Sequence, residues 1–133
     1  MGDNFFVGQN ILVTGGCGVI GRELILKLVN SGANVRCVDF SDLPLDLREL
    51  DIEYYKLDLS DEKSQFLFRY NPDYVFHLAA DFERSEETYE FWDSNFNNNV
   101  LASKNLLSKV VKCSNLKKVV FASSYLIYDK DLY

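Results

Sequence analysis

The sequence predicts an α/β fold in which a doubly wound parallel sheet is covered by helices on both faces. Short apolar runs typical of strands alternate with longer runs of helical spacing along the chain, and this alternation predicts βαβ units with right-handed crossovers. A glycine-rich turn joins the first strand to the first helix, as is typical of such sheets. The 133 residues suit a single domain, and we expect about five strands in the order 3-2-1-4-5.

The expected strands are short apolar runs bounded by turn-forming residues, a pattern typical of parallel strands that are buried on both faces. They lie at residues 10–14, 35–39, 53–57, 74–78 and 118–122. The connection over residues 40–51 contains Pro44 and several aspartates, so we expect a loop or one irregular turn there.

Two helices are expected between the first four strands. The first begins near Gly18 and ends before Gly32, because glycine readily takes the left-handed conformation that follows a helix. The second begins at Ser60, a suitable N-cap residue, and ends at Tyr70 before an Asn-Pro pair.

The longest helical pattern runs from about residue 86 to residue 113. Three successive asparagines at residues 97–99 interrupt it, and asparagine is a poor helix former, so we expect a local bend or a specific polar role there. The predicted apolar stripe consists of Phe96, Val100, Leu107 and Val111, with Leu106 and Val110 beside it.

Composition excludes several classes of function. The formal net charge of −6 opposes attraction to nucleic acid or to anionic lipid. Three widely spaced cysteines and one histidine favour neither a disulfide framework nor a metal site. The sequence shows neither a signal peptide nor an apolar run of about 18 residues. We therefore expect a cytoplasmic protein without a metal, nucleic-acid or membrane partner.

Residues 14–21, Thr-Gly-Gly-Cys-Gly-Val-Ile-Gly, lie at the turn between the first strand and the first helix. Glycine takes positive φ freely and lets backbone N–H groups approach a pyrophosphate, so this turn predicts a dinucleotide site. Asp39 ends the second strand, where a carboxylate can bind both adenosine ribose hydroxyls and repel a 2′-phosphate. We therefore expect NAD as the cofactor rather than NADP.

Together with these features, four further blocks resemble the N-terminal, Rossmann-like part of the extended short-chain dehydrogenases/reductases, the NAD-dependent sugar-nucleotide epimerase/dehydratase family. The blocks are Asp58-Leu59, Val-Phe-His-Leu-Ala-Ala at 75–80, Asn-Val-Leu-Ala-Ser-Lys-Asn-Leu-Leu at 99–107, and Phe-Ala-Ser-Ser at 121–124. In the third block, Ala102 and Ser103 replace the family's glycine and threonine. The resemblance implies transient hydride transfer between NAD and a nucleotide-activated sugar.

The resemblance also implies roles for individual residues. Asp58 would bind the adenine amino group, and Leu59 would donate its backbone N–H to the ring. Ser124 would be the catalytic serine that hydrogen-bonds the reacting sugar hydroxyl, whereas His77 is expected to be a packing residue. The predicted cofactor-binding set is Gly15, Gly18, Val19, Ile20, Gly21, Asp39, Phe40, Asp58, Leu59, Leu78, Ala79, Ala80, Asn99 and Ser123.

The family's proton acceptor is a tyrosine that has a lysine four residues later, about 25 residues after the serine. The chain ends nine residues after Ser124, and none of its tyrosines has a lysine at that spacing. We therefore expect one NAD(P)-binding domain over residues 1–133, truncated before the rest of the cofactor domain and the substrate domain, and inactive alone. Tyr125 and Leu126 replace the Asp-Glu pair of the 4,6-dehydratases, which leaves epimerase, reductase or decarboxylase chemistry open.

Three alternatives remain open at this stage. A short, non-catalytic NAD(P)-sensing or regulatory protein would keep the same fold without the proton acceptor. A methyltransferase that uses S-adenosylmethionine shares a glycine loop and an acid after the second strand, but the Thr14-Gly15 and Ser123-Ser124 pairs fit it poorly. A homodimer is also open, because the helix near residues 95–111 resembles the family's dimer-interface helix while its usual partner helix is missing.

Overall fold

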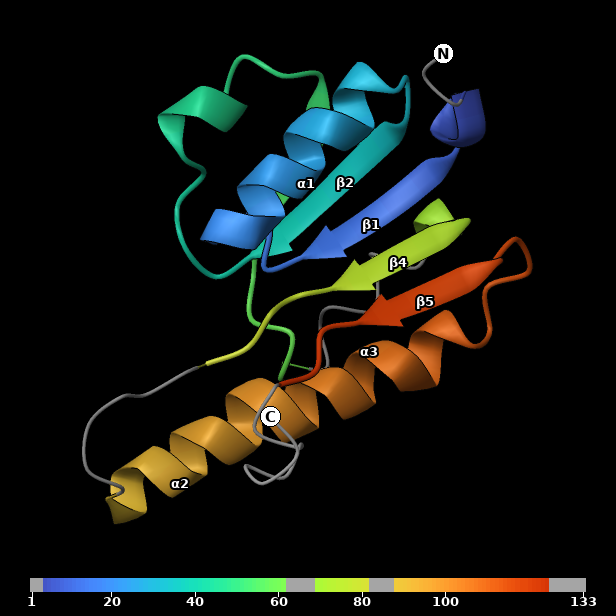
Figure 1. Ribbon diagram of the computed structural model, residues 1–133. Coiled ribbons are helices and arrows are strands. Elements are labelled where there is room, and N and C mark those ends of the chain that lie inside the picture. The colour runs from blue at the N-terminus through green and yellow to red at the C-terminus, as the bar shows by residue number, and fades with distance from the viewer. Residues whose placement is uncertain (1–3, 62–68, 82–87, 125–133) are drawn as a thin grey trace, which may run out of the picture.

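The computed structural model describes residues 4–61, 69–81 and 88–124 (Figure 1). Five strands in this part of the chain form one parallel sheet in the order β3-β2-β1-β4-β5, which confirms the predicted fold class and strand order. The strands are β1 (Asn10–Thr14), β2 (Asn34–Asp39), β3 (Ile52–Lys56), β4 (Tyr74–His77) and β5 (Lys118–Phe121). The chain runs outward from β1 in both directions, so the topological switch point lies between β1 and β4.

Helices cover the two faces of this sheet (Figure 1). Helix α1 (Val19–Asn30) packs on one face, and Gly32 follows its C-cap residue Ser31 with a φ of 80°, the left-handed stop that the sequence predicts. The long helix on the other face is a continuous run of α2 (Tyr89–Asn95), the π-helical segment η4 (Phe96–Leu101) and α3 (Ala102–Val110). Short 3₁₀ turns occur at η1 (Asn4–Phe6) and η2 (Leu45–Leu47), the second within the predicted irregular connection.

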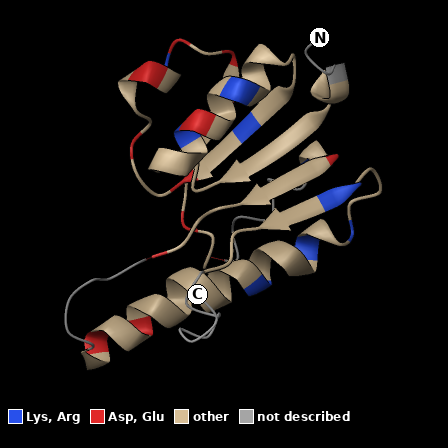
Figure 2. Ribbon diagram, viewed as in Figure 1, with Lys and Arg blue, Asp and Glu red and all other residues tan. Residues whose placement is uncertain are grey.

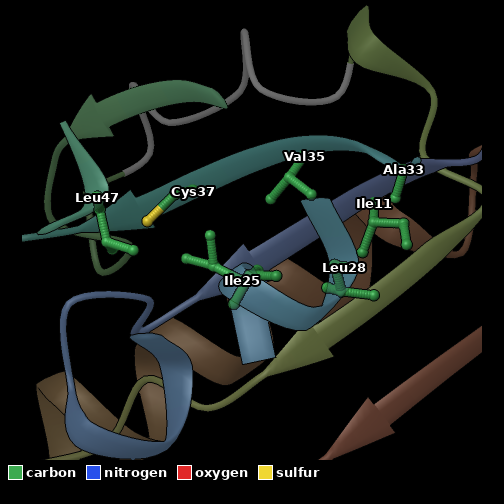
Figure 3. Close-up of a cluster of buried hydrophobic side chains, with 8 residues drawn as sticks. Ile11, Ile25, Leu28, Ala33, Val35, Cys37 and Leu47 are labelled. Carbon is green, nitrogen blue, oxygen red and sulfur yellow. The ribbon is translucent and has the colours of Figure 1, made fainter. Parts of the chain in front are cut away.

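The first hydrophobic core lies between the sheet and α1 (Figure 3). Ile25 and Leu28 of α1 pack there against inward-facing strand residues, and both side chains are almost fully buried. Figure 3 shows these two side chains facing Val35 and Ile11 of the sheet, with Leu47 of η2 at one end of the core. Each fully buried aliphatic side chain contributes about 1.5–3 kcal/mol to the free energy of unfolding.

The second core lies between the opposite face of the sheet and α3. Leu12 of β1 and Val75 of β4 face the helix residues Ala102, Leu106 and Val110, which recur at a spacing of four. The apolar stripe that the sequence predicts for this helix is wrong in part, because Phe96, Val100 and Val111 are exposed. Leu106 and Val110, which were expected beside the stripe, form the buried face together with Ala102.

Charge is distributed along the long helix in the sense that its dipole favours (Figure 2). Glu90 lies in the first turn of α2, and Lys109 lies in the last turn of α3. Acidic side chains near a helix N-terminus and basic ones near its C-terminus each stabilise it by about 0.3–1 kcal/mol.

Two sequence predictions fall mostly or partly outside the described residues. The helix expected from Ser60 to Tyr70 includes residues 62–68, and the expected start of the long helix at residue 86 lies in the gap before Thr88. Thr88 is the N-cap that the structure shows for α2, because its hydroxyl oxygen accepts from Phe91 N at 3.2 Å. Across the described ranges, none of the helices is long and apolar enough to span a bilayer.

Candidate cofactor-binding site

A cleft of about 240 Å³ opens at the carboxyl edge of the sheet, where the arrowheads of the parallel strands in Figure 1 point. It lies at the switch point, where doubly wound sheets bind their ligands. The connections after β1, β2, β3 and β4 all contribute to it, together with the long helix. Its lining residues are Gly15, Cys17, Gly18, Val38, Asp39, Phe40, Ser41, Leu57, Asp58, Leu59, Leu78, Ala79, Ala80, Asn98 and Ala102.

The glycine turn after β1 packs directly against the loop after β4. Gly15 has a φ of 71°, and a Cβ atom built on it would lie 2.6 Å from the backbone nitrogen of Ala79. At Gly21, in the first turn of α1, a Cβ atom would overlap the carbonyl oxygen of Gly15. Glycine at these two positions therefore brings strand, turn and helix closer together than a side chain would allow.

The N-terminus of α1 opens beside this turn without a side-chain cap. Gly18 is the N-cap residue, and the hydrogen bond from Arg22 N to Gly18 O closes the first helical turn at 2.9 Å. The N–H groups of Val19, Ile20 and Gly21 therefore precede the first intrahelical donor. Uncapped donors at the positive end of a helix dipole fit the pyrophosphate of a dinucleotide.

Asp39 is almost fully buried at the end of β2, with 8% of its surface exposed. Its Oδ2 atom accepts from Cys17 N at 2.9 Å, and its Oδ1 atom accepts from Ser41 N at 2.9 Å. These amides orient the carboxylate, and each oxygen keeps a second lone pair that can accept from a ribose hydroxyl. None of the described lining residues is a lysine or arginine, so the cleft offers no cationic side chain to a 2′-phosphate.

Arg36, the nearest basic residue along β2, is engaged away from the cleft. Its guanidinium is paired with Glu53 and lies 4.0 Å from the ring centroid of Tyr70 and 5.1 Å from that of Tyr55. Its ion-pair partner is Glu53 of β3. This pairing leaves Asp39 as the charged group at the end of β2.

Two thiols lie at the glycine turn: Cys17 is part of the turn and lines the cleft, and Cys37 lies in the core beneath it. Burial, reinforced by the negative charge of Asp39, raises the pKa of Cys17 to about 11. Burial likewise raises the pKa of Cys37 to about 12, so both thiols are neutral near pH 7. Both are free cysteines, and Asp39 supplies the negative charge on this side of the cleft.

The connection after β3 is held to the long helix. Asp58 is exposed, and its Oδ1 atom accepts from Ser60 N at 2.8 Å. Asn105 of α3 donates from its side-chain amide to Ser60 O at 2.9 Å and to Leu59 O at 3.3 Å. The segment predicted to contact adenine therefore has a fixed position at the edge of the cleft.

The asparagines of η4 hold the loop after β4. Asp81 N donates to the side-chain oxygen of Asn99 at 2.6 Å, and Asn99 Nδ2 donates back to Asp81 O at 2.9 Å. Asn98 Nδ2 and Ser94 Oγ both donate to the carboxylate oxygen Asp81 Oδ2, at 3.1 and 3.0 Å. The polar role expected in the asparagine run therefore falls to Asn98 and Asn99, which hold the side chain and the backbone of Asp81.

The structure brings most of the predicted cofactor residues together. Those that line the cleft are Gly15, Gly18, Asp39, Phe40, Asp58, Leu59, Leu78, Ala79 and Ala80. Val19, Ile20 and Gly21 form the first turn of α1, and Asn99 lies on η4. Ser123 and Ser124 follow β5 and are exposed, outside the lining of the cleft.

Sequence reasoning missed six lining residues. They are Cys17, Val38, Ser41, Leu57, Asn98 and Ala102. The first four are next to predicted residues or within the glycine turn, so their position along the chain was the available signal. Asn98 and Ala102 are one turn apart on the long helix, and the asparagine run was the signal for that face.

The chain is similar in sequence and in fold to known epimerases and to a solved structure that contains NAD. The chain is 32% identical to the UDP-glucose 4-epimerase of Caenorhabditis elegans over 90% of its own length. An epimerase of Methanothermobacter thermautotrophicus superposes with a TM-score of 0.84 at 30% identity over 96% of the chain. MoeE5 in complex with UDP-glucose and NAD superposes with a TM-score of 0.76 at 32% identity over 90% of the chain.

The chain spans about two fifths of the length of these proteins: 39% of the nematode epimerase, 39% of the archaeal epimerase and 38% of MoeE5. Residues 11–132 match the model of the NAD dependent epimerase/dehydratase family, whose cofactor is NAD. This match covers nearly all of the sheet and the cleft. The predicted family is confirmed, and the chain belongs to the NAD dependent epimerase/dehydratase family.

Proposed function

We propose that the cleft binds NAD, with the adenosine ribose at Asp39 and the pyrophosphate at the first turn of α1. Adenine would lie against Asp58 and Leu59, and the loop at Leu78–Ala80 would line the region between ribose and pyrophosphate. The observation that carries this proposal is the oriented carboxylate of Asp39 in the same cleft as an uncapped helix N-terminus. A diol and a diphosphate joined through adenosine match that pair of features.

We further propose that NAD binds more tightly than NADP. A 2′-phosphate would place two negative charges beside the carboxylate of Asp39 in a partly buried site. The amide donors from Cys17 and Ser41 already bind Asp39, and the described lining offers no lysine or arginine to compensate the phosphate.

A calorimetric titration of the purified chain with NAD and with NADP tests both proposals. Asp39→Asn keeps the shape of the side chain and removes its charge, so we expect NAD to bind about tenfold or more weakly, since hydrogen bonds to charged groups are worth ~1.5–3 kcal/mol. The matched control is Asp42→Asn, a nearby exposed carboxylate paired with Lys56, which should leave the affinity for NAD unchanged. Tighter binding of NADP than of NAD by the unaltered chain would overturn the cofactor assignment.

The wider reaction we propose is transient oxidation of a nucleotide-activated sugar. NAD would accept the hydride, and the Ser124 hydroxyl would hydrogen-bond the reacting sugar hydroxyl. Support comes from the family and from the similarity to a UDP-glucose 4-epimerase. The proton acceptor of the resemblance, tyrosine with lysine four residues later, does not occur among the 133 residues. We therefore propose that residues 1–133 form one cofactor-binding domain that binds NAD without turning over a sugar substrate.

Turnover and binding can be measured separately on the same preparation. We expect NAD binding by calorimetry and no NADH formation or sugar epimerisation with a panel of UDP- and dTDP-sugars. Robust turnover by this chain would show that a different group accepts the proton. Absence of both binding and turnover would contradict the assignment of the cleft itself.

A further inference from the structure

His77, at the end of β4, is a buried polar residue to which the sequence assigned only packing. The residue is 2% exposed, and its ring is hydrogen-bonded at both nitrogens. Nδ1 lies 2.6 Å from the hydroxyl oxygen of Thr14, at the end of β1. Nε2 lies 2.8 Å from the hydroxyl oxygen of Ser103, on α3. The imidazole therefore links three elements that surround the cleft.

The partners of Ser103 determine the direction of these hydrogen bonds. Ser103 Oγ lies 2.5 Å from the backbone oxygen of Asn99, which can only accept, so the single hydroxyl proton of Ser103 points there. Nε2 of His77 must then carry a proton and donate to Ser103. In the neutral ring Nδ1 is an acceptor, so the Thr14 hydroxyl donates to it.

This directional chain connects the walls of the cleft. Thr14 immediately precedes Gly15, and its hydroxyl oxygen accepts a long hydrogen bond from Ala79 N at 3.4 Å. At the other end of the network, the backbone carbonyl of Asn99 accepts a hydrogen bond from the Ser103 hydroxyl. The Asn99 side chain hydrogen-bonds to the backbone of Asp81. The glycine turn, the loop after β4 and the long helix therefore share one hydrogen-bond network that passes through His77.

We propose that His77 is a positioning residue for cofactor binding: held as the neutral Nε2–H tautomer, it keeps the glycine turn, the β4 loop and α3 at the separation that the dinucleotide requires. This inference rests on the proposed function of the cleft. It assigns His77 no contact with the cofactor, and its effect passes through Thr14 and Ser103.

A second proton on the ring would break the pattern. Nδ1–H would then face the Thr14 oxygen, whose own proton would lose its acceptor, and a charge would be buried without a counterion. The groups that face the ring in the described structure are the hydroxyls of Thr14 on β1 and Ser103 on α3, and the ring of Phe121 on β5, with centroids 5.2 Å apart. None of these described groups is charged, and burial lowers the pKa of His77.

Nitrogen NMR of the ¹⁵N-histidine-labelled chain tests the tautomer without any ligand. His77 is the single histidine, so its two ring nitrogens need no further assignment by mutation. At about pH 7.5 we expect a protonated Nε2 and an unprotonated Nδ1. The Nδ1–H tautomer, or rapid exchange between the two, would overturn the proposal.

NAD titration of matched variants tests the positioning role. Thr14→Val and Ser103→Ala each remove one link, and we expect each to weaken NAD binding about five- to tenfold. Ser108→Ala is the control on α3, because the Ser108 hydroxyl makes a comparable bond to Asn105 O at 3.0 Å on the exposed side of the helix. The double variant Thr14→Val/Ser103→Ala should bind NAD with about the same affinity as the single variant that binds it more weakly. Both substitutions interrupt the same hydrogen-bond network, so their effects should not add.

The outcomes separate this inference from the proposed function. Amide spectra of each variant establish that the fold is retained, so a change in affinity is not a loss of folded protein. Equal NAD affinities for Ser103→Ala and Ser108→Ala would overturn the positioning role while the cleft assignment stands. Failure of the unaltered chain to bind NAD would overturn the proposed function and the positioning role together, whatever the tautomer.

Discussion

At the scale of single residues, backbone approach sets the shape of the cleft. Gly15 combines a positive φ with a close approach to the backbone of Ala79, whereas Gly8 has a similar φ of 67° and open space where a Cβ atom would lie. Substituting each glycine by alanine therefore separates two contributions to the free energy of unfolding: the left-handed backbone, present at both positions, and steric overlap, present at Gly15 alone of the two. The steric overlap is the contribution that changes the wall of the cleft.

We predict that Gly8→Ala costs about 1–2 kcal/mol of unfolding free energy, from the left-handed conformation alone. Gly15→Ala should add an overlap with the β4 loop that costs about 1–3 kcal/mol more and should also weaken NAD binding. Urea unfolding monitored by circular dichroism measures the stability of both variants, and calorimetric titration measures their affinity for NAD. Equal stability and equal NAD affinity of the two variants would show that the turn and the loop are not in contact.

His77 makes stability depend on pH in a defined direction. Burial lowers its pKa below the usual 6.5, so the unfolded chain binds more protons than the folded chain as pH falls below that value. The free energy of unfolding should therefore be highest above about pH 6.5 and should fall as the pH is lowered. Asp73, whose pKa is lowered by the Asn10 amide and by Lys117, contributes its own loss only in a more acidic range, near and below its usual 3.8.

Urea unfolding near pH 7.5 and near pH 5.5 tests this prediction, since the two values bracket the usual histidine pKa. His77→Phe replaces the ring with one that does not titrate, so the loss of stability between these two pH values should be smaller in the variant. The comparison uses the difference between pH values, which cancels the constant cost of losing the hydrogen bonds. An identical pH dependence in both proteins would contradict the assigned pKa shift.

At the scale of elements, η4 gives the long helix two functions. Its π turns place Asn98 and Asn99 so that both side chains hydrogen-bond to Asp81. The first residue after η4, Ala102, begins the buried face of α3 that packs against the sheet. π segments are frequent at functional sites.

Asn99→Ala should lower the free energy of unfolding by about 1–3 kcal/mol, because it leaves two backbone groups of Asp81 without their partner. The control is Asn97→Ala, an exposed position in the same segment, where alanine's higher helix propensity should keep or slightly raise the stability. Urea unfolding of both variants, followed by NAD titration, measures the two effects. We also expect weaker NAD binding by Asn99→Ala, because Asp81 directly follows Leu78, Ala79 and Ala80, which line the cleft.

The same element shows where sequence reasoning fails. Strands β1 and β2 were predictable because their apolar runs reflect burial on both faces, a local property of the sequence. The apolar stripe of the long helix was not predictable in the same way. The 3.6-residue period of an α-helix fails across a π turn, because a π turn contains an extra residue. Phe96 and Val100 therefore fall out of phase with Leu106 and Val110. The asparagine run predicted a departure from regular helix without fixing its geometry.

At the scale of the whole molecule, the strand order and the cleft could be anticipated because both follow from topology and from a glycine turn. Side-chain contacts between segments that are distant in the sequence could not be anticipated. Phe6 of η1 packs edge-on against Tyr74 with ring centroids 5.4 Å apart and against Phe76 at 6.4 Å, so aromatic side chains join η1 to β4. The network through His77 has the same character, since His77 is 63 residues from Thr14 and 26 residues from Ser103 in the sequence.

Because β1 contributes to both cores, NAD bound at the carboxyl end of β1 should stabilise the molecule as a unit. At a concentration about 100 times the Kd, a ligand that binds only the folded state adds ~2.7 kcal/mol. For a chain of this length that corresponds to a rise in Tm of roughly 10 °C. We expect this rise with NAD, a smaller one with NADP at the same concentration, and little change with NAD for Asp39→Asn.

Differential scanning calorimetry measures these shifts, with Asp42→Asn as the control that should retain the full NAD effect. The size of the shift should follow the logarithm of the NAD concentration, because stabilisation by mass action has that form. A single transition that moves as a whole would mean that the two cores unfold together. Two transitions, of which NAD moves only one, would show instead that β1 does not couple the core under α1 to the core under α3.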